Sequence, residues 1–141
     1  TMGTKTINEW EKAVVFLLNM DGWDLKHCGD GNSRYDAIGK TPKGKDCVIE
    51  MKFRKKHYDE KMLEKDKYDA LMALDQNIVK IFFVNDPKGN FMYWLNTLKM
   101  PKLEKKYCPD TTVYTKKRLH KEVYLLTENE ASKININISP N

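Results

Sequence analysis

The stretch that decides the fold is a pair of short apolar segments, YDAI at residues 35–38 and VIEMKF at residues 48–53. Between them lies GKTPKGK at residues 39–45, whose glycines, proline and lysines are typical of an exposed turn. Two apolar segments joined by such a turn predict a hairpin-like pair of neighbouring strands.

Both segments carry charged residues where a buried strand is normally apolar. Because side chains alternate between the two faces of a strand, Glu50 and Lys52 share one face, while Ile49 and Met51 share the other. If the two strands are neighbours, Asp36 lies beside Glu50. Two carboxylates and an amine at one point are costly to desolvate and repel one another in part, and a divalent cation relieves this cost.

The structural alternative is an ion pair on an exposed sheet edge, which stabilises a protein by only about 0.2–1 kcal/mol. The interruption of an otherwise apolar strand by charged residues favours the functional interpretation over this alternative.

The surrounding sequence predicts the elements that pack around this pair of strands. Residues 6–20 have helical periodicity, with Thr6 as the N-cap and Glu9 as its capping-box partner, and a helix end at Asp21-Gly22. The further expected elements are a strand at 23–27, a helix at 59–73, and strands at 78–84 and 91–95. The expected order is therefore an αβββαβ core with one further strand.

The region after Leu98 changes in composition. Residues 99–121 hold eight lysines or arginines against two acidic residues, a net charge of +6, with aromatic residues between them. Such a segment either follows a phosphate backbone or forms a solvated, irregular extension, and both interpretations stay open here. Residues 123–126 then predict a strand, with Ile134, Ile136 and Ile138 alternating in a partner strand.

The length of 141 residues fits one domain, which we divide into a core at 2–98 and a basic C-terminal extension at 99–141 packed on the same domain. The three cysteines form no zinc-ligand pattern, and His27 has no second ligand at metal-binding spacing, so we expect reduced cysteines and an edge histidine. No apolar run is long enough for a bilayer and no signal-like start is seen, so an intracellular, cytoplasmic protein without a membrane partner is expected.

Asp36 followed by Glu50-Met51-Lys52 resembles the signature of the PD-(D/E)xK nuclease superfamily, whose fold is called restriction-endonuclease-like. That signature is an acidic residue, a variable gap and then (D/E)-x-K. Here Tyr35 stands where the name of the family has proline.

A second resemblance lies upstream of this signature and points to archaeal-type Holliday-junction resolvases. Glu11 on the first expected helix, followed by Gly22-Trp23, is similar to their first-helix glutamate and the glycine and aromatic residue that follow it. The two resemblances cover about residues 6–95 and imply an α/β (α+β) fold with a central mixed sheet flanked by helices.

The resemblance implies a metal site and a catalytic lysine. Mg²⁺ or Mn²⁺ would be held by Asp36, Glu50, Glu11 and the backbone carbonyl of Met51. Lys52 would orient or deprotonate the attacking water. Asp36, Glu50, Lys52 and Glu11 are thus the expected catalytic residues.

The function implied is that of a metal-dependent endodeoxyribonuclease acting on branched or structured DNA, as a homodimer and encoded by a phage or another mobile element. A restriction-type or repair nuclease, and a non-catalytic nucleic-acid-binding protein that keeps the fold, are the alternatives. The residues expected to contact DNA are basic: Lys55, Lys56, Lys67, Lys116, Lys117 and Arg118.

Overall fold

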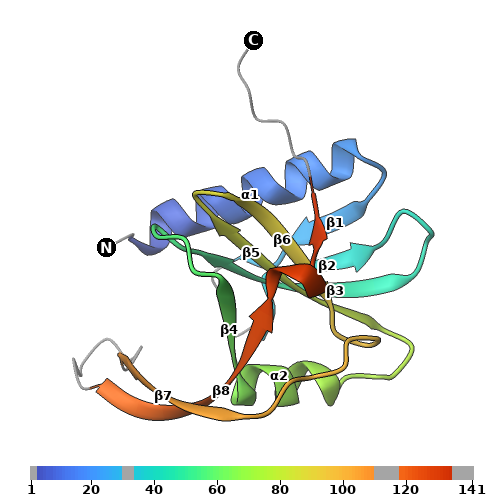
Figure 1. The fold of residues 1–141 in the computed structure, drawn as a ribbon. Helices are drawn as coiled ribbons and strands as arrows, with labels where there is room; N and C mark the ends of the chain where they lie inside the picture. The colour runs from blue at the N-terminus through green and yellow to red at the C-terminus, as the bar shows by residue number, and fades with distance from the viewer. Residues whose placement is uncertain (1–2, 30–33, 110–117, 135–141) are drawn as a thin grey trace.

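A six-stranded mixed sheet forms the centre of the protein (Figure 1). The computed structural model describes residues 3–29, 34–109 and 118–134. The strand order is β1-β2-β3-β5-β6-β9, in which β3 and β5 run parallel and the other neighbours run antiparallel. The bounds are β1 Asp24–His27, β2 Ala37–Lys40, β3 Asp46–Phe53, β5 Val79–Asp86, β6 Gly89–Trp94 and β9 Ser132–Lys133. The predicted central mixed sheet is therefore present.

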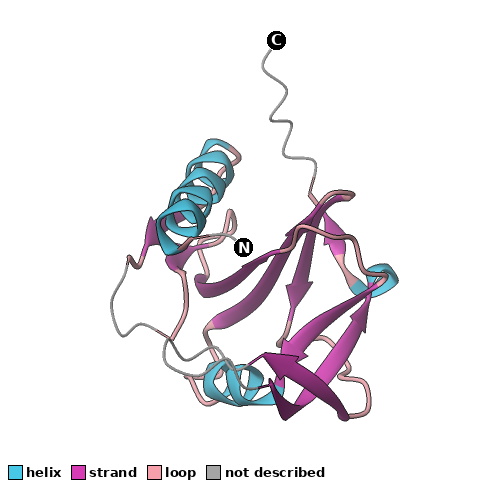
Figure 2. Cartoon of the chain, turned by 90° about the vertical axis from the view of Figure 1, so that its left-hand side faces the viewer, coloured by secondary structure: helices cyan, strands magenta, loops and turns pink. Residues whose placement is uncertain are grey.

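Helix α1 (Thr4–Met20) covers one face of this sheet. The other face is covered by helix α2 (Lys65–Met72) and by a second sheet of three strands in the order β4-β8-β7. Those strands are β4 Glu60–Glu64, β7 Glu104–Pro109 and β8 Arg118–Thr127, and β8 leads into the short helix η1 at Glu128–Glu130. Figure 2 shows strands of the central sheet lying between the two longer helices.

Strand β3 has the predicted alternation of faces. Ile49 and Met51 belong to the core cluster that contains the α1 residues Val14 and Leu18. Val48 belongs to the cluster on the opposite face, with residues of β4, α2 and β8. Because side chains alternate along β3, Glu50 and Lys52 lie on the same face as Val48 and are directed toward the α2 side of the sheet.

The hairpin that joins β2 to β3 has the register expected from the sequence, with Ala37 opposite Ile49. Gly39 in β2 lies directly against β1, because a Cβ atom at this position would lie 1.9 Å from the carbonyl oxygen of Asp24. Glycine is thus required for β1 to pair with β2.

Helix α1 begins earlier than predicted, and the Thr6 capping box is wrong. The N-cap is Gly3 and has no side-chain hydrogen bond, while the amide of Ile7 donates to the Gly3 carbonyl at 3.1 Å. That bond already belongs to the helix, so Thr6 lies inside its first turn. The C-terminal end is as predicted, with Asp21 as the C-cap and Gly22 at a φ of 94°.

The single helix predicted for residues 59–73 is wrong in its first part. Residues 60–64 form strand β4, and α2 begins only at Lys65. Strand β4 pairs with β8, where Met62 lies opposite Leu125, and it buries alternate side chains at Lys61 and Leu63. This pairing with a segment far along the chain overrides the local helical pattern.

The C-terminal region adds strands to both sheets. The strand predicted at 123–126 is present within β8, whose neighbours are β4 and β7. Of its predicted partner strand only Ile134 is described, and its amide donates to the Asn90 carbonyl of β6 at 3.3 Å. The chain instead adds β9 to the edge of β6, with Lys133 opposite Phe91. Ile136 and Ile138, like Lys116 and Lys117, lie outside the described residues.

Candidate active site

Asp36 lies immediately before β2 and continues its ladder by one residue. Its amide donates to the Ile49 carbonyl at 2.8 Å, and its own carbonyl accepts from the Cys28 amide at 2.9 Å. Since Ala37 is opposite Ile49, Asp36 comes level with Glu50 on the neighbouring strand. Its Oδ2 atom accepts a hydrogen bond from the Met51 amide at 2.7 Å, which fixes the carboxylate at this end of the hairpin.

Glu50 is a buried carboxylate on the α2 side of the sheet, with 6% of its surface exposed. Its Oε1 atom accepts a hydrogen bond from Lys67 Nζ of α2 at 3.2 Å. Burial and the negative charge of Asp36 raise the pKa of Glu50, while Lys67 and Lys52 oppose this rise. The Glu50 carboxylate is therefore crowded by one anion and stabilised by two amines.

Lys52 follows Glu50 on the same face of β3. Burial, reinforced by the positive charge of Lys67 and a hydrogen bond with it, lowers the pKa of Lys52 to about 8. For Lys67, burial disfavours the charged form, but Glu50 and the bond with Lys52 outweigh it and raise its pKa. Of the two amines, Lys52 is thus the one that gives up its proton more readily.

Glu11 reaches the same region from α1 and is also buried, with 6% exposure. Its Oε1 atom lies 2.7 Å from His27 Nε2. Because the Gly29 amide donates to His27 Nδ1, the Nε2 atom carries the proton and donates to Glu11. Burial raises the pKa of Glu11, and the negative charge of Asp36 adds to that rise despite the bond from His27.

The residues predicted from the sequence therefore come together at one end of the β2–β3 hairpin, but they are not in contact as a single set. Glu11 is bonded to His27, and Glu50 to Lys67. Within residues 3–29, 34–109 and 118–134, three potential ligands lie within 4.8 Å of one another only in a different group, His57, Asp59 and Glu128. The carboxylates of Glu11, Asp36 and Glu50 are nevertheless hard oxygen donors, and burial together with the charge of Asp36 raises the pKa of both glutamates. A donor set of this chemistry fits a divalent cation.

His27 and Lys67 each make a contact in the site that the sequence did not predict. His27 was expected as an edge residue, and it is one, but it also holds Glu11. The sequence placed it at the end of a strand, and the structure pairs this position with Ala37, the residue that follows Asp36. Lys67 was expected to contact DNA, whereas its amine bonds to Glu50.

A groove of about 790 Å³ begins where β3 ends. It is lined by the four residues that follow Lys52, which are Phe53, Arg54, Lys55 and Lys56. Lys106 and Tyr107 of β7 line it as well. Two of the lysines predicted to contact DNA thus line this groove. Arg54, Lys61 and Lys106 add positive charge to its lining, and Asp59, Glu60 and Asp86 add negative charge. Arg118 lies at the start of β8, and Lys116 and Lys117 fall outside the described residues.

A comparison with solved structures finds the same fold in Hjc, a Holliday junction resolvase from the archaeal hyperthermophile Archaeoglobus fulgidus. The TM-score is 0.60, the match covers 89% of both chains, and 13% of the residues are identical. This likeness confirms the restriction-endonuclease-like fold predicted from the sequence. No protein-family model and no curated protein matches the chain. No helix in the described part of the chain is long and apolar enough to cross a membrane.

Proposed function

We propose that this protein is a metal-dependent deoxyribonuclease that hydrolyses DNA phosphodiester bonds, as an endonuclease on branched or structured DNA. One observation carries the proposal: Asp36, Glu50 and Lys52 lie together at the end of one hairpin, within an otherwise apolar part of the sheet. The fold shared with a Holliday junction resolvase supports branched DNA as the substrate.

We infer that the cation is Mg²⁺ or Mn²⁺, held by the carboxylates of Asp36, Glu50 and Glu11 and the carbonyl of Met51. The Met51 amide already fixes Asp36, and His27 holds Glu11 close to it. When bound, the ion would lower the pKa of a coordinated water and neutralise charge on the scissile phosphate. Burial, with the charge of Asp36 added to it, raises the pKa of Glu50 and of Glu11, and a bound cation would favour the charged form of both carboxylates.

Lys52 would hold the attacking water and donate a hydrogen bond to the charge that develops on the phosphate. Lys52 is half-buried on β3, two residues after Glu50 and on the same face, so its amine would reach the phosphate from a fixed direction. Lys67 would act as a positioning residue, because its bond to Glu50 keeps this carboxylate from turning away from Asp36.

The DNA backbone would follow the groove that starts at Phe53, directly after Lys52. Its lining has five lysines or arginines against three acidic residues, and Arg54, Lys55 and Lys56 together with Lys106 and Tyr107 of β7 would provide positive charge and an aromatic ring. A homodimer would place two such sites on the arms of a branched junction.

The test is cleavage of a four-way junction and of plasmid DNA with Mg²⁺, with Mn²⁺ or with EDTA. We expect cleavage with either metal, none with EDTA, and a loss of at least about 100-fold in Asp36→Asn. The matched control is Asp46→Asn, an exposed carboxylate in the same hairpin, which should cleave like the wild type.

A rival function is nucleic-acid binding without cleavage. The bonds of Glu11 to His27 and of Glu50 to Lys67 favour it, because they already occupy two of the three carboxylates. Junction binding by the wild type, with no cleavage of any substrate under either metal, would support this rival and refute the nuclease proposal.

A further inference from the structure

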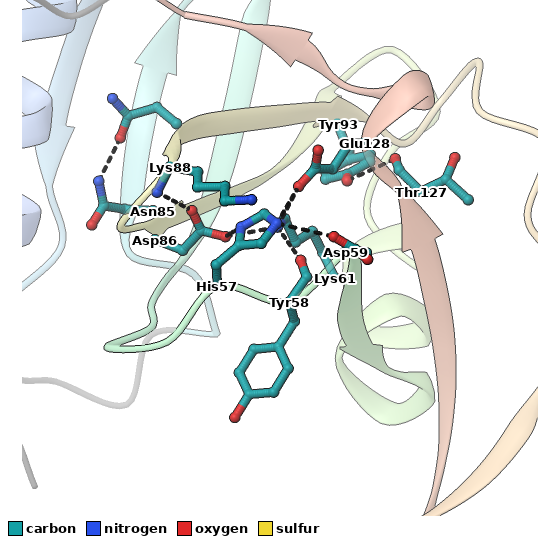
Figure 3. Close-up of polar contacts among 11 residues, drawn as sticks. His57, Tyr58, Asp59, Lys61, Asn85, Asp86, Lys88, Tyr93, Thr127 and Glu128 are labelled. Atoms are coloured by element: carbon teal, nitrogen blue, oxygen red, sulfur yellow. Dashed lines mark hydrogen bonds and ion pairs between the residues drawn. The ribbon is translucent and has the colours of Figure 1, made fainter.

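A second cluster of ligand-type side chains lies where the loop before β4 meets helix η1, and its Asp59 lines the groove described above (Figure 3). His57 Nε2 is 3.1 Å from Asp59 Oδ1 and 3.1 Å from Glu128 Oε1. Tetrahedral coordination with metal–ligand bonds of 2.0–2.1 Å places neighbouring ligand atoms about 3.3–3.4 Å apart. The observed separations are close to that value, and we propose that His57, Asp59 and Glu128 bind a divalent transition-metal ion such as Zn²⁺.

The other ring nitrogen of His57 supports this assignment. Nδ1 lies 2.8 Å from Oδ2 of Asp86, whose side chain is 1% exposed. Metal-binding histidines commonly donate their second N–H to a carboxylate in this way, which fixes the ring and leaves the other nitrogen as the ligand. Here that arrangement directs the Nε2 lone pair at two further carboxylate oxygens, which is repulsive unless a proton or a cation lies between them.

The charges of the cluster leave room for a dication. Asp59, Asp86 and Glu128 contribute three negative charges, and Lys61 contributes one positive charge, so the cluster with a neutral His57 has a net charge of −2. A proton on His57 would reduce this to −1, whereas a divalent ion would bring it to zero. A partly buried group of this kind is more stable when its charges are balanced.

Lys61 restricts where the ion lies. Its amine donates to Asp86 Oδ2 at 2.7 Å, to Glu128 Oε1 at 3.1 Å and to the Tyr58 carbonyl, and it occupies the buried side of the cluster. Asp59 is 95% exposed, so the ion would lie on the solvent side, with water as a fourth ligand. The imidazole ligand favours zinc, cobalt or nickel over Mg²⁺ or Ca²⁺.

The site would join the loop before β4 to the end of β8. Asp59 and His57 precede β4 and Glu128 follows β8, so one ion would connect the two ends, and the bond of His57 to Asp86 links the site to β5 of the central sheet. Its ligands share no residue with the nuclease site proposed above. Zn²⁺ would thus stabilise the folded protein without being the ion that acts on DNA.

The experiment is a titration of the full-length, EDTA-stripped protein with Co²⁺, followed by visible absorption and then by displacement with Zn²⁺. It is done in the Asp36→Asn background, so that binding at the nuclease site contributes little. We expect one equivalent of Co²⁺ with the intense absorption of a tetrahedral ion, and at least about a tenfold loss of affinity in Asp59→Asn.

Asp59→Asn is a suitable variant because the side chain is exposed and its loss removes no core packing. Glu128→Gln provides a second test, and Asp46→Asn, an exposed carboxylate elsewhere, is the control. Absence of the tetrahedral spectrum, or equal Co²⁺ affinity in Asp59→Asn and Asp46→Asn, would overturn the proposal and leave the cluster as ion pairs around a protonated His57.

Discussion

The ion pair between Lys61 and Asp86 joins the two sheets and should be important for stability. Lys61 Nζ lies 2.7 Å from Asp86 Oδ2, and the two side chains are 2% and 1% exposed. We expect Asp86→Asn to lower the free energy of unfolding by about 3–5 kcal/mol, because it leaves the Lys61 ammonium buried with less compensation. The same change also removes the charged partner of His57.

Replacing the other partner, Lys61, should lower the free energy of unfolding by less than Asp86→Asn does. In Lys61→Met, Asp86 still accepts from the Lys88 amide at 2.8 Å and keeps its contact with His57. The methionine side chain would also keep the packing on Phe91, whose ring centroid lies 4.2 Å from Lys61 Nζ. We expect a loss of about 1–3 kcal/mol. The double variant should show a coupling energy of about 0.5–3 kcal/mol.

Urea unfolding at pH 7 in EDTA measures these differences, and the midpoint should shift without a change in the m-value. The exposed pair of Lys40 and Asp46 is the matched control, with a similar distance of 2.8 Å but side chains that are 55% and 70% exposed. Asp46→Asn should change stability by no more than about 0.5 kcal/mol. An Asp86→Asn variant as stable as Asp46→Asn would refute the reasoning.

Three further variants test other parts of the structure. Burial raises the pKa of Tyr93 above its ordinary value of 10, so the unfolded chain loses this proton at a lower pH than the folded protein. Above pH 10 the free energy of unfolding of the wild type should therefore fall by about 1.4 kcal/mol per pH unit more than that of Tyr93→Phe. Replacing both Lys55 and Lys56 with alanine should weaken junction binding and reduce the slope of log Kd against log salt by about 2. Lys67→Met should slow cleavage by about tenfold or more at unchanged junction affinity, because Glu50 loses its partner.

Each of these variants has a control on the same molecule. Tyr107→Phe, at an exposed tyrosine, should keep the alkaline pH dependence of the wild type. Replacing Lys43 and Lys45, in the exposed turn, should leave the salt slope unchanged. Lys67→Arg should restore part of the cleavage rate. Equal behaviour of a variant and its control would contradict the role assigned to that residue.

The sequence was informative where the fold depends on neighbouring segments. Helix α1, the β2–β3 hairpin and strand β5 have local patterns of apolar residues and turns, and they are found within a few residues of the predicted bounds. The position of Asp36 opposite Glu50 follows from the length of the turn between the two strands and from the alternation of side chains along them.

The errors arose where distant segments decide the structure. Residues 60–64 have a mixed pattern that suits a helix, and only their pairing with β8 shows that they form a strand that buries Lys61. Likewise, no local pattern predicts the contact of His27 with Glu11 or of Lys67 with Glu50, because each joins side chains from different elements.

The measurement that tests the central claim most directly is single-turnover cleavage of a four-way junction in Mg²⁺ with enzyme in excess, comparing Lys52→Met with Lys43→Met. Both variants remove one lysine, but only Lys52 lies beside Glu50 on β3, whereas Lys43 is exposed in the turn. We predict that Lys52→Met binds the junction normally and cleaves at least about 100-fold more slowly, while Lys43→Met cleaves like the wild type. Equal cleavage rates for the two variants would contradict the claim that this hairpin forms the active site.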